Sequence, residues 1–309
     1  MKPILEVKNV VKQYGNYTAL NSVSLSVPQG SIYGLLGPNG AGKTSLIRII
    51  NQITMPDSGE VLLDGEKLGP QHIGQIGYMP EERGLYKTMK VGEQALYLAQ
   101  LKGLTKKEAK EQLDYWFEKL EIQGWWNKKI QELSKGMAQK IQFVVTVLHR
   151  PKLLILDEPF SGFDPVNANL IKDEIFGLAK GGSTIIFSTH RMEQVEEICD
   201  HIVLVNQGKK ILDGTVHNIK QEFKENIFNI RLSDVPANIS SPSFDVVRQN
   251  GNSLTVKIHA GSRSNDVLQY FLQYATIEGF NEILPSLNDI FINLVEGTRA
   301  TRQFQQVTT

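Results

Sequence analysis

The sequence has little cysteine, no long apolar run and no excess of either charge. Its 309 residues include a single cysteine, Cys199, so no disulfide can form within the chain, as suits a reducing compartment. The longest apolar stretches, such as residues 153–156, fall far short of the ~18 residues that a membrane-spanning helix needs. Residues 1–7 also lack the apolar segment of a signal peptide. If the protein acts at a membrane, we expect it to do so through a partner.

The balance of charge bears on the kind of partner. Lysine and arginine together number 33, as do aspartate and glutamate, so the formal net charge is +0. A protein that coats nucleic acid usually carries a basic excess. We therefore expect no nucleic-acid partner, although a local basic patch stays open.

The longer, N-terminal part of the chain shows the pattern of an α/β sheet. Apolar residues alternate over 4–10 and 23–27, which predicts half-exposed antiparallel strands. Residues 32–36 are apolar almost throughout, as in a strand buried on both faces. Helical spacing follows over about 91–148. Strand character then returns between helical segments, which predicts a parallel sheet, at 153–156, 184–187 and 202–205.

A change of composition near Phe223 marks a second domain. Beyond it, apolar residues alternate over 228–232 and 254–258, and amphipathic helices are expected over 265–274 and 287–294. The predicted domains are 1–222, with a helical subdomain at about 88–150, then a small α+β domain over 223–298 and a polar, flexible tail over 299–309.

A glycine-rich loop at 37–44 matches the phosphate-binding pattern G-x-x-x-x-G-K-[ST]. An apolar strand precedes the loop and a helical pattern follows it, which is the context that this motif requires. Its glycines let backbone N–H groups face phosphate oxygens, Lys43 reaches the β- and γ-phosphates, and the Thr44 hydroxyl binds Mg²⁺. We therefore expect ATP and Mg²⁺ as cofactors, with ATP held by Gly37, Pro38, Asn39, Gly40, Ala41, Gly42, Lys43, Thr44 and Ser45.

An apolar strand at 153–156 ends in two acids, Asp157 and Glu158. Because α/β sheets bind ligands at the carboxyl ends of their strands, we expect both carboxylates beside the glycine-rich loop. Asp157 is predicted to hold Mg²⁺ through water, and Glu158 to polarise the attacking water as the catalytic base.

A pentapeptide upstream of the acidic strand, Leu133-Ser134-Lys135-Gly136-Met137, carries a family resemblance. With the other motifs, in this order over roughly residues 4–222, it resembles the signature motif of ABC ATPases. The resemblance implies an α/β P-loop NTPase core with an antiparallel β subdomain and a helical subdomain, plus the small C-terminal α+β domain. It also implies that two cassettes meet head to tail, so that one subunit contacts the γ-phosphate held by the other through Ser134, Lys135, Gly136 and Met137.

Two features qualify this signature. Lys135 and Met137 stand where the family more often has glycine and glutamine, while the retained Ser134 and Gly136 carry the phosphate chemistry. Taken alone, the pentapeptide is equally open to a simpler interpretation, in which Ser134 is a plain N-cap of a helix.

Three further positions take roles from the same resemblance. Tyr14 resembles the aromatic residue that stacks on adenine, with Tyr17 as a nearby alternative. The loop from Ser161 to Asp164 resembles the segment that crosses the dimer interface. His190 resembles the histidine that hydrogen-bonds the γ-phosphate and helps to hold the attacking water, which makes it a second catalytic candidate.

Glu81 departs from the family, which usually has a glutamine here as a Mg²⁺ ligand. A glutamate oxygen can also approach Mg²⁺ but adds negative charge, so whether Glu81 replaces the glutamine stays open. Cys199 and His201 lack the four-ligand set of a metal site and are expected to be structural.

The resemblance implies an ATP-hydrolysing subunit of a membrane ABC transporter. The expected partners are an integral membrane permease and a second copy of the chain or a homologous cassette. They would hold the protein on the cytoplasmic face of the cell membrane, with the permease contact at Arg83 to Tyr86 and the following helix. The C-terminal portion, which ends in residues 285–291, resembles the extra domain of bacterial export-type cassettes. This resemblance favours an exporter, and sodium or drug efflux is common among such cassettes.

The alternative function is that of a soluble ABC ATPase acting in translation or on DNA. Translation members generally carry two cassettes in one chain, whereas this chain has one. DNA-repair members split their cassette with a long coiled coil, and the span from Thr44 to Ser134 is too short for that. Neutral charge also argues against direct nucleic-acid binding.

Overall fold

The computed structural model describes residues 2–82 and 84–296, and the chain divides into two compact units between Val216 and His217. The division expected from the sequence comes slightly later, after residue 222. The expected flexible tail, 299–309, lies outside the described residues. In the part of the chain that is described, no helix is both long and apolar enough to cross a membrane.

One sheet of the first unit is antiparallel, with strand order β2-β1-β4-β5. In β2, buried Val23, Leu25 and Val27 alternate with the more exposed serines between them, because one face of the sheet packs on the core. The predicted antiparallel strands are therefore confirmed, and the four strands are β1 (Pro3–Tyr14), β2 (Tyr17–Pro28), β4 (Ser58–Leu63) and β5 (Glu66–Lys67).

The other sheet of this unit has six strands in the order β10-β9-β3-β8-β7-β6. All neighbours are parallel except β10, which runs antiparallel to β9. Every residue of β3, β7 and β8 is buried, which confirms the prediction from their apolar runs. The strands are β3 (Ile32–Leu36), β6 (Ile76–Met79), β7 (Leu153–Asp157), β8 (Thr184–Ser188), β9 (His201–Asn206) and β10 (Lys209–Thr215).

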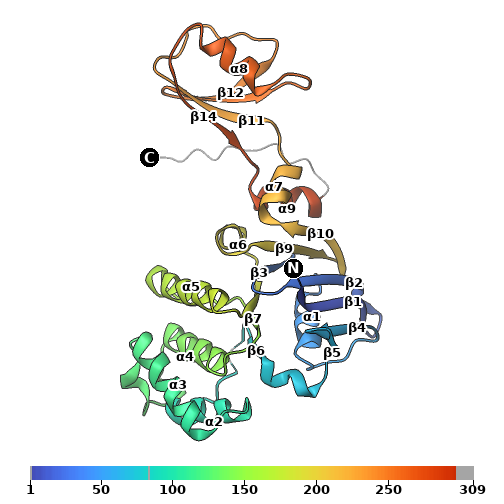
Figure 1. Ribbon diagram of the computed structural model, residues 1–309, viewed down its shortest axis with the longest axis vertical. Coiled ribbons are helices and arrows are strands. Elements are labelled where there is room, and N and C mark those ends of the chain that lie inside the picture. The colour runs from blue at the N-terminus through green and yellow to red at the C-terminus, as the bar shows by residue number, and fades with distance from the viewer. Residues whose placement is uncertain (1, 83, 297–309) are drawn as a thin grey trace. The chain divides into compact units, whose positions relative to one another are not determined.

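Helix α1 (Lys43–Ile50) packs between the two sheets (Figure 1). Its buried side chains, Leu46, Ile47, Ile49 and Ile50, join residues of both sheets in one apolar core. The remaining helices of the α/β part are α5 (Pro165–Lys180), α6 (Met192–Ile198) and the short 3₁₀ helix η1 (Pro70–Gln75). Because α1 starts directly after the β3 loop, the core fixes the position of that loop.

A helical block, green in Figure 1, is inserted between β6 and β7. Thr105 starts α3 with a capping box, in which its hydroxyl accepts from the Glu108 N–H and the Glu108 carboxylate accepts from the Thr105 N–H. Trp116 and Phe143 pack edge to face, with ring centroids 5.8 Å apart, and so join α3 to α4. The block comprises α2 (Val91–Leu101), α3 (Lys106–Lys119), η2 (Gln123–Trp125), η3 (Ile130–Glu132) and α4 (Lys135–Val147).

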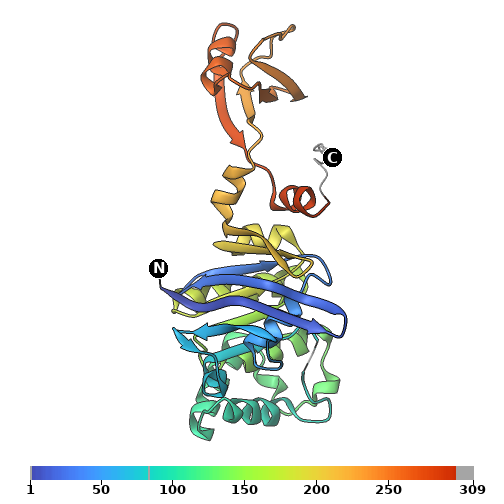
Figure 2. The same ribbon diagram turned by 90° about the vertical axis from the view of Figure 1, so that its right-hand side faces the viewer.

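The second unit holds a four-stranded antiparallel sheet in the order β12-β13-β11-β14 (Figure 2). Its core joins apolar residues of the sheet, such as Ile230 and Val256, to Val267 and Phe271 of α8. The two predicted helices and the strands at 228–232 and 254–258 are confirmed. The elements, entered through α7 (Val216–Glu222), are β11 (Ile227–Leu232), β12 (Phe244–Asn250), β13 (Ser253–Ile258), α8 (Ser264–Phe271), β14 (Ile277–Ile283) and α9 (Leu287–Glu296).

Candidate active site

The loop between β3 and α1 is closely packed on both sides. Gly37 has φ 151°, and a Cβ placed on it would lie 2.2 Å from the carbonyl oxygen of Val205. Gly42 has φ 109°, and its Cβ would lie 2.3 Å from the carbonyl oxygen of Ala19. Only glycine fits at these two positions. The loop leads directly into the N-terminus of α1, where the backbone N–H groups and the helix dipole favour an anion.

Lys43 is the first residue of α1 and folds back over this loop. Its ammonium donates hydrogen bonds to the carbonyl oxygens of Gly37 at 2.6 Å and Pro38 at 3.1 Å. Burial lowers the pKa of Lys43, while nearby carboxylates, chiefly Asp157 and Glu158, act in the opposite direction. Thr44 is exposed and Ser45 half-buried beside it. Because Lys43 interacts electrostatically with Asp157 and Glu158, the loop and the two acids predicted from the sequence lie close together.

The acidic end of β7 is a concentration of negative charge. Burial raises the pKa of Asp157, and the charges of Glu81 and Glu158 raise it further. Oxygen donors beside a phosphate-binding loop fit Mg²⁺, which binds through one or two carboxylates plus phosphate and water. In residues 2–82 and 84–296, no three His, Cys, Asp or Glu side chains converge on a metal position. Asp157 and Glu81 lie close enough to interact electrostatically, and Thr44 stands in the first turn of α1, so these are the residues that could hold the predicted Mg²⁺.

Glu158 is held by the segment that follows β8. Its Oε1 accepts a hydrogen bond from the His190 backbone N–H at 2.8 Å and lies 2.7 Å from the His190 Nδ1. Its Oε2 accepts from the Thr189 hydroxyl at 3.0 Å. The structure therefore brings together Glu158 and His190, which the sequence selected separately, and adds Thr189, which it did not.

The strand register explains why Thr189 was missed. Asp157 of β7 pairs with Ser188 of β8, so the next residues, Glu158 and Thr189, face each other beyond the sheet. Both strands were predicted, but their adjacency was not, and only adjacency reveals this contact. Glu158 also has φ 49°, a left-handed conformation that is unusual for glutamate and often found at functional sites.

The Thr189 hydroxyl yields a testable prediction. Thr189 is fully buried, and valine keeps its shape while removing the hydroxyl. We expect T189V to lower kcat for ATP about 10-fold with little change in KM, because a hydrogen bond to a charged group contributes on the order of 1.5 kcal/mol. Steady-state ATPase assays on the full chain measure both constants. T189S should keep most of the rate, and an unchanged kcat in T189V would contradict the assignment.

Two tyrosines lie at the β1–β2 turn, next to the glycine-rich loop. The Tyr17 hydroxyl donates to the Gly40 carbonyl at 2.7 Å, and its side chain is 53% exposed. Tyr14, its partner across the turn, is 44% exposed, with Lys12 Nζ 5.5 Å from the ring centroid. Both rings offer an accessible face, and Tyr17 is the one in contact with the loop.

The signature segment and the expected dimer loop each start a helix. The Ser134 hydroxyl accepts from the Met137 N–H at 3.2 Å and caps α4, so the simple N-cap interpretation is correct as far as it goes. Asp164 caps α5 in the same way, accepting from the Asn167 N–H at 3.0 Å. Ser134, Lys135 and Asp164 are exposed. Capping therefore leaves them accessible to another molecule.

The residues set aside as structural lie where α6 ends and β9 begins. Cys199 is buried, and a Cβ placed on Gly34 would lie 3.1 Å from its Sγ. His201 stacks on Tyr33, with ring centroids 5.0 Å apart, and its Nε2 lies 3.0 Å from Asp213 Oδ1. Of the expected permease contact, Arg83 lies outside the described residues, and Tyr86 is 55% exposed.

Two family models match the chain. One, described as ABC transporter, matches residues 20–161, and one described as the C-terminal domain of DrrA1-3-like ATP-binding proteins matches residues 214–295. The uncharacterized ABC transporter ATP-binding protein YhaQ of Bacillus subtilis (strain 168) is 40% identical over 293 residues, 94% of this chain and 98% of that protein.

A further relative and a solved structure extend the comparison. The Nod factor export ATP-binding protein I of Cupriavidus metallidurans is 33% identical over 222 residues, 71% of this chain and 73% of that protein. The solved ATP-binding subunit of an ABC transporter is 31% identical and has a TM-score of 0.67, over 71% of this chain and 93% of that one. The likeness confirms the fold expected for the larger part of the chain.

Proposed function

Because this chain belongs to the ABC transporter ATP-binding proteins, a family of ATPases, we propose that it powers an exporter by closing a dimer around ATP and driving a separate permease. The observation that carries the proposal is the set of hydrogen bonds between the Glu158 carboxylate and Thr189 and His190, beside the β3–α1 loop. That arrangement supports the roles proposed for Glu158 as catalytic base and for the adjacent loop as phosphate site. The relative whose name specifies Nod factor export supports the export direction.

In this proposal the β3–α1 loop binds the triphosphate. Backbone N–H groups at the start of α1 face its oxygens, and Lys43 exchanges its contacts with the Gly37 and Pro38 carbonyls for the β- and γ-phosphates. The Tyr14 or Tyr17 ring lies against the adenine. Asp157 and Thr44, with Glu81 as a further candidate, hold Mg²⁺, which neutralises phosphate charge when bound.

Hydrolysis depends on the Glu158 carboxylate. It accepts a proton from the attacking water, while Thr189 and the His190 backbone hold it in place. The His190 ring is 66% exposed, with its Nδ1 2.7 Å from Glu158 Oε1, and in this proposal it gives up that contact to turn towards the γ-phosphate. Ser134 and Gly136 of a second copy, or of a homologous cassette, complete the anion site from the opposite side. ATP therefore favours the closed dimer, and its loss reopens it.

The permease contact is assigned to the segment around Tyr86 and to α2, on the cytoplasmic face of the membrane. Replacing Tyr86 with alanine is expected to lower recovery of the chain with membranes at least about 5-fold, because exposed aromatic residues often dominate interface energies. The measurement is co-sedimentation and co-purification of the tagged full chain from cells. Tyr115→Ala provides a matched control, since that side chain on α3 is 52% exposed against 55% for Tyr86.

The same experiment separates the two functions considered from the sequence. Co-purification of an integral membrane protein supports the exporter. Recovery with ribosomes or DNA, unaffected by Y86A, would instead support a soluble ATPase of this family.

A further inference from the structure

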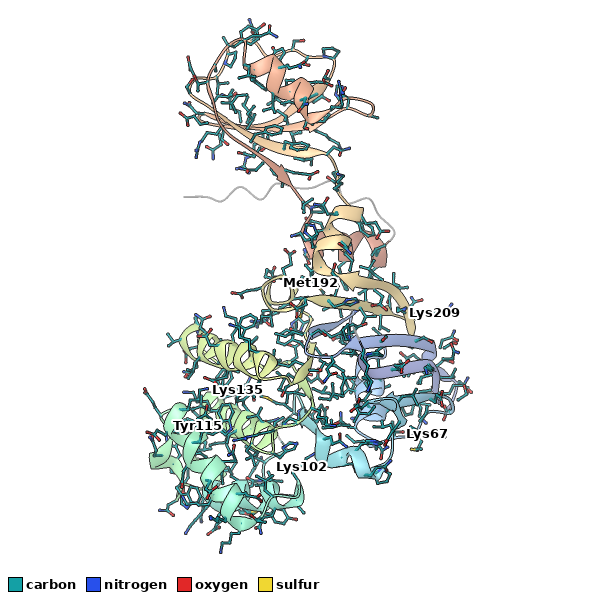
Figure 3. The ribbon with its side chains drawn as sticks, viewed as in Figure 1. Lys67, Lys102, Tyr115, Lys135, Met192 and Lys209 are labelled. Atoms are coloured by element: carbon teal, nitrogen blue, oxygen red, sulfur yellow. The ribbon has the colours of Figure 1, made fainter. Side chains whose placement is uncertain are left out.

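Lys135, labelled in Figure 3, lies across the loop that leads into α5. Gly162 of that loop has φ 88°, and a Cβ placed on it would lie 2.8 Å from each of the Cγ, Cδ and Cε atoms of Lys135. Contacts this short do not occur in proteins, so a larger residue at 162 would push the lysine aside. The absence of a side chain at 162 is what leaves room for the lysine stem.

Other contacts join the same two elements beneath Lys135. A Cβ placed on Gly136 would lie 3.3 Å from the carbonyl oxygen of Gly162. Gln139, 1% exposed, donates from Nε2 to the carbonyl oxygen of Pro159 at 3.3 Å. The first turns of α4 therefore rest on residues 159–162, from the buried Gln139 outward to the exposed Lys135. A lysine stem in such a position covers apolar and backbone surface while its charge stays in water.

We propose that Lys135 is a positioning residue whose stem fixes the spacing between the start of α4 and the loop 161–164. Both segments carry residues assigned to the dimer interface, Ser134 and Gly136 on one and Ser161 and Asp164 on the other. Holding them together makes them meet a second copy as one surface. The inference rests on the proposed ATP-closed dimer. It links two residues, because the Lys135 stem occupies the space that a side chain at 162 would fill, in addition to the φ of 88° that itself favours glycine there.

The test measures dimerisation of the full chain in an E158Q background, where ATP is retained. Light scattering gives the ATP concentration at half-maximal dimer. K135G and G162A are each expected to raise it about 10-fold, since residues in contact typically show coupling of this order. The double variant K135G/G162A should need no more ATP for half-maximal dimer than G162A alone, because both changes remove the same contact. If the two single increases in this ATP concentration multiply in the double variant, the two residues act independently and the proposal is wrong.

A second variant separates the stem from the charge. K135M keeps a stem of similar length, and because the stem makes the contact, we expect the ATP concentration at half-maximal dimer to rise less than about 3-fold. If K135M raises this ATP concentration as much as K135G does, dimerisation depends on the lysine charge and the proposal is wrong. K135M and K135G leave the loop backbone unchanged, so they decide the matter even if G162A fails to fold.

The backbone strain of G162A needs its own control. Gly182 has φ 99° and nothing within 4 Å of an added Cβ, so G182A introduces similar strain without a displaced neighbour. The G182A variant should dimerise at the same ATP concentration as the E158Q parent, and only its Tm should be lower. A parent that does not dimerise with ATP contradicts the proposed dimer itself. A parent that dimerises, combined with independent effects at 135 and 162, contradicts only the role of Lys135.

Discussion

Replacing Lys43 with alanine is expected to lower ATP turnover by more than about 100-fold, because a half-buried cation directed at the phosphates stabilises charge that develops in the transition state. In the structure Lys43 is held against the Gly37 and Pro38 carbonyls, close to the carboxylates of β7. Alanine removes the positive charge that interacts with those carboxylates, which would then repel the phosphates, so ATP binding should weaken as well. Isothermal titration with ATP and steady-state hydrolysis measure the two effects.

The control for K43A is Lys67→Ala. Lys67, labelled in Figure 3, is an exposed lysine on β5 of the same unit. Its loss changes the net charge by the same amount without touching the β3–α1 loop. Normal hydrolysis by K43A would rule out this loop as the phosphate site.

Glu158→Gln is expected to separate ATP binding from hydrolysis. Glutamine keeps the shape of the side chain, and its single oxygen can still accept from the His190 N–H. Its amide NH2 then faces the Thr189 hydroxyl, which can accept instead of donate, but the amide cannot take a proton from water. Turnover should fall by roughly 10²–10⁴, the usual contribution of a general base. Since ATP is then bound and not consumed, the chain should accumulate as a dimer, which light scattering with and without ATP detects.

Glu60→Gln serves as the matched control for E158Q. Glu60 is an exposed carboxylate on β4. The E60Q protein should therefore hydrolyse ATP at the normal rate. An E158Q protein that remains monomeric with ATP and turns over normally would contradict both the catalytic role of Glu158 and the ATP-closed dimer.

Local motifs made the centre of this site predictable from sequence. The β3–α1 loop and the acids at the end of β7 are each set by a few consecutive residues, and their apolar strands follow from pattern alone. Strand β12 escaped prediction because six of its seven residues are exposed and it lacks an apolar alternation. β14 is likewise only half-buried, as an edge strand.

What the sequence did not reveal are contacts between distant segments. The Thr189–Glu158 hydrogen bond needs the register of β7 on β8. The Tyr17–Gly40 bond needs the β1–β2 turn to lie beside the loop. The match of Lys135 to Gly162 needs α4 and the loop before α5 to be packed together. Each contact joins residues of two segments that are far apart in the chain, and no sequence motif relates the two segments.

The single cysteine has a practical consequence. Cys199 is 7% exposed, and burial raises the pKa of its thiol, so it should react slowly with maleimides. The natural sequence is therefore already a background for site-specific spectroscopic labels, with no cysteine to remove. A cysteine introduced at an exposed position such as Val166, 79% exposed at the start of α5, would carry one probe per chain. Paired fluorophores or spin labels there would report in real time how two copies approach each other as nucleotide is added.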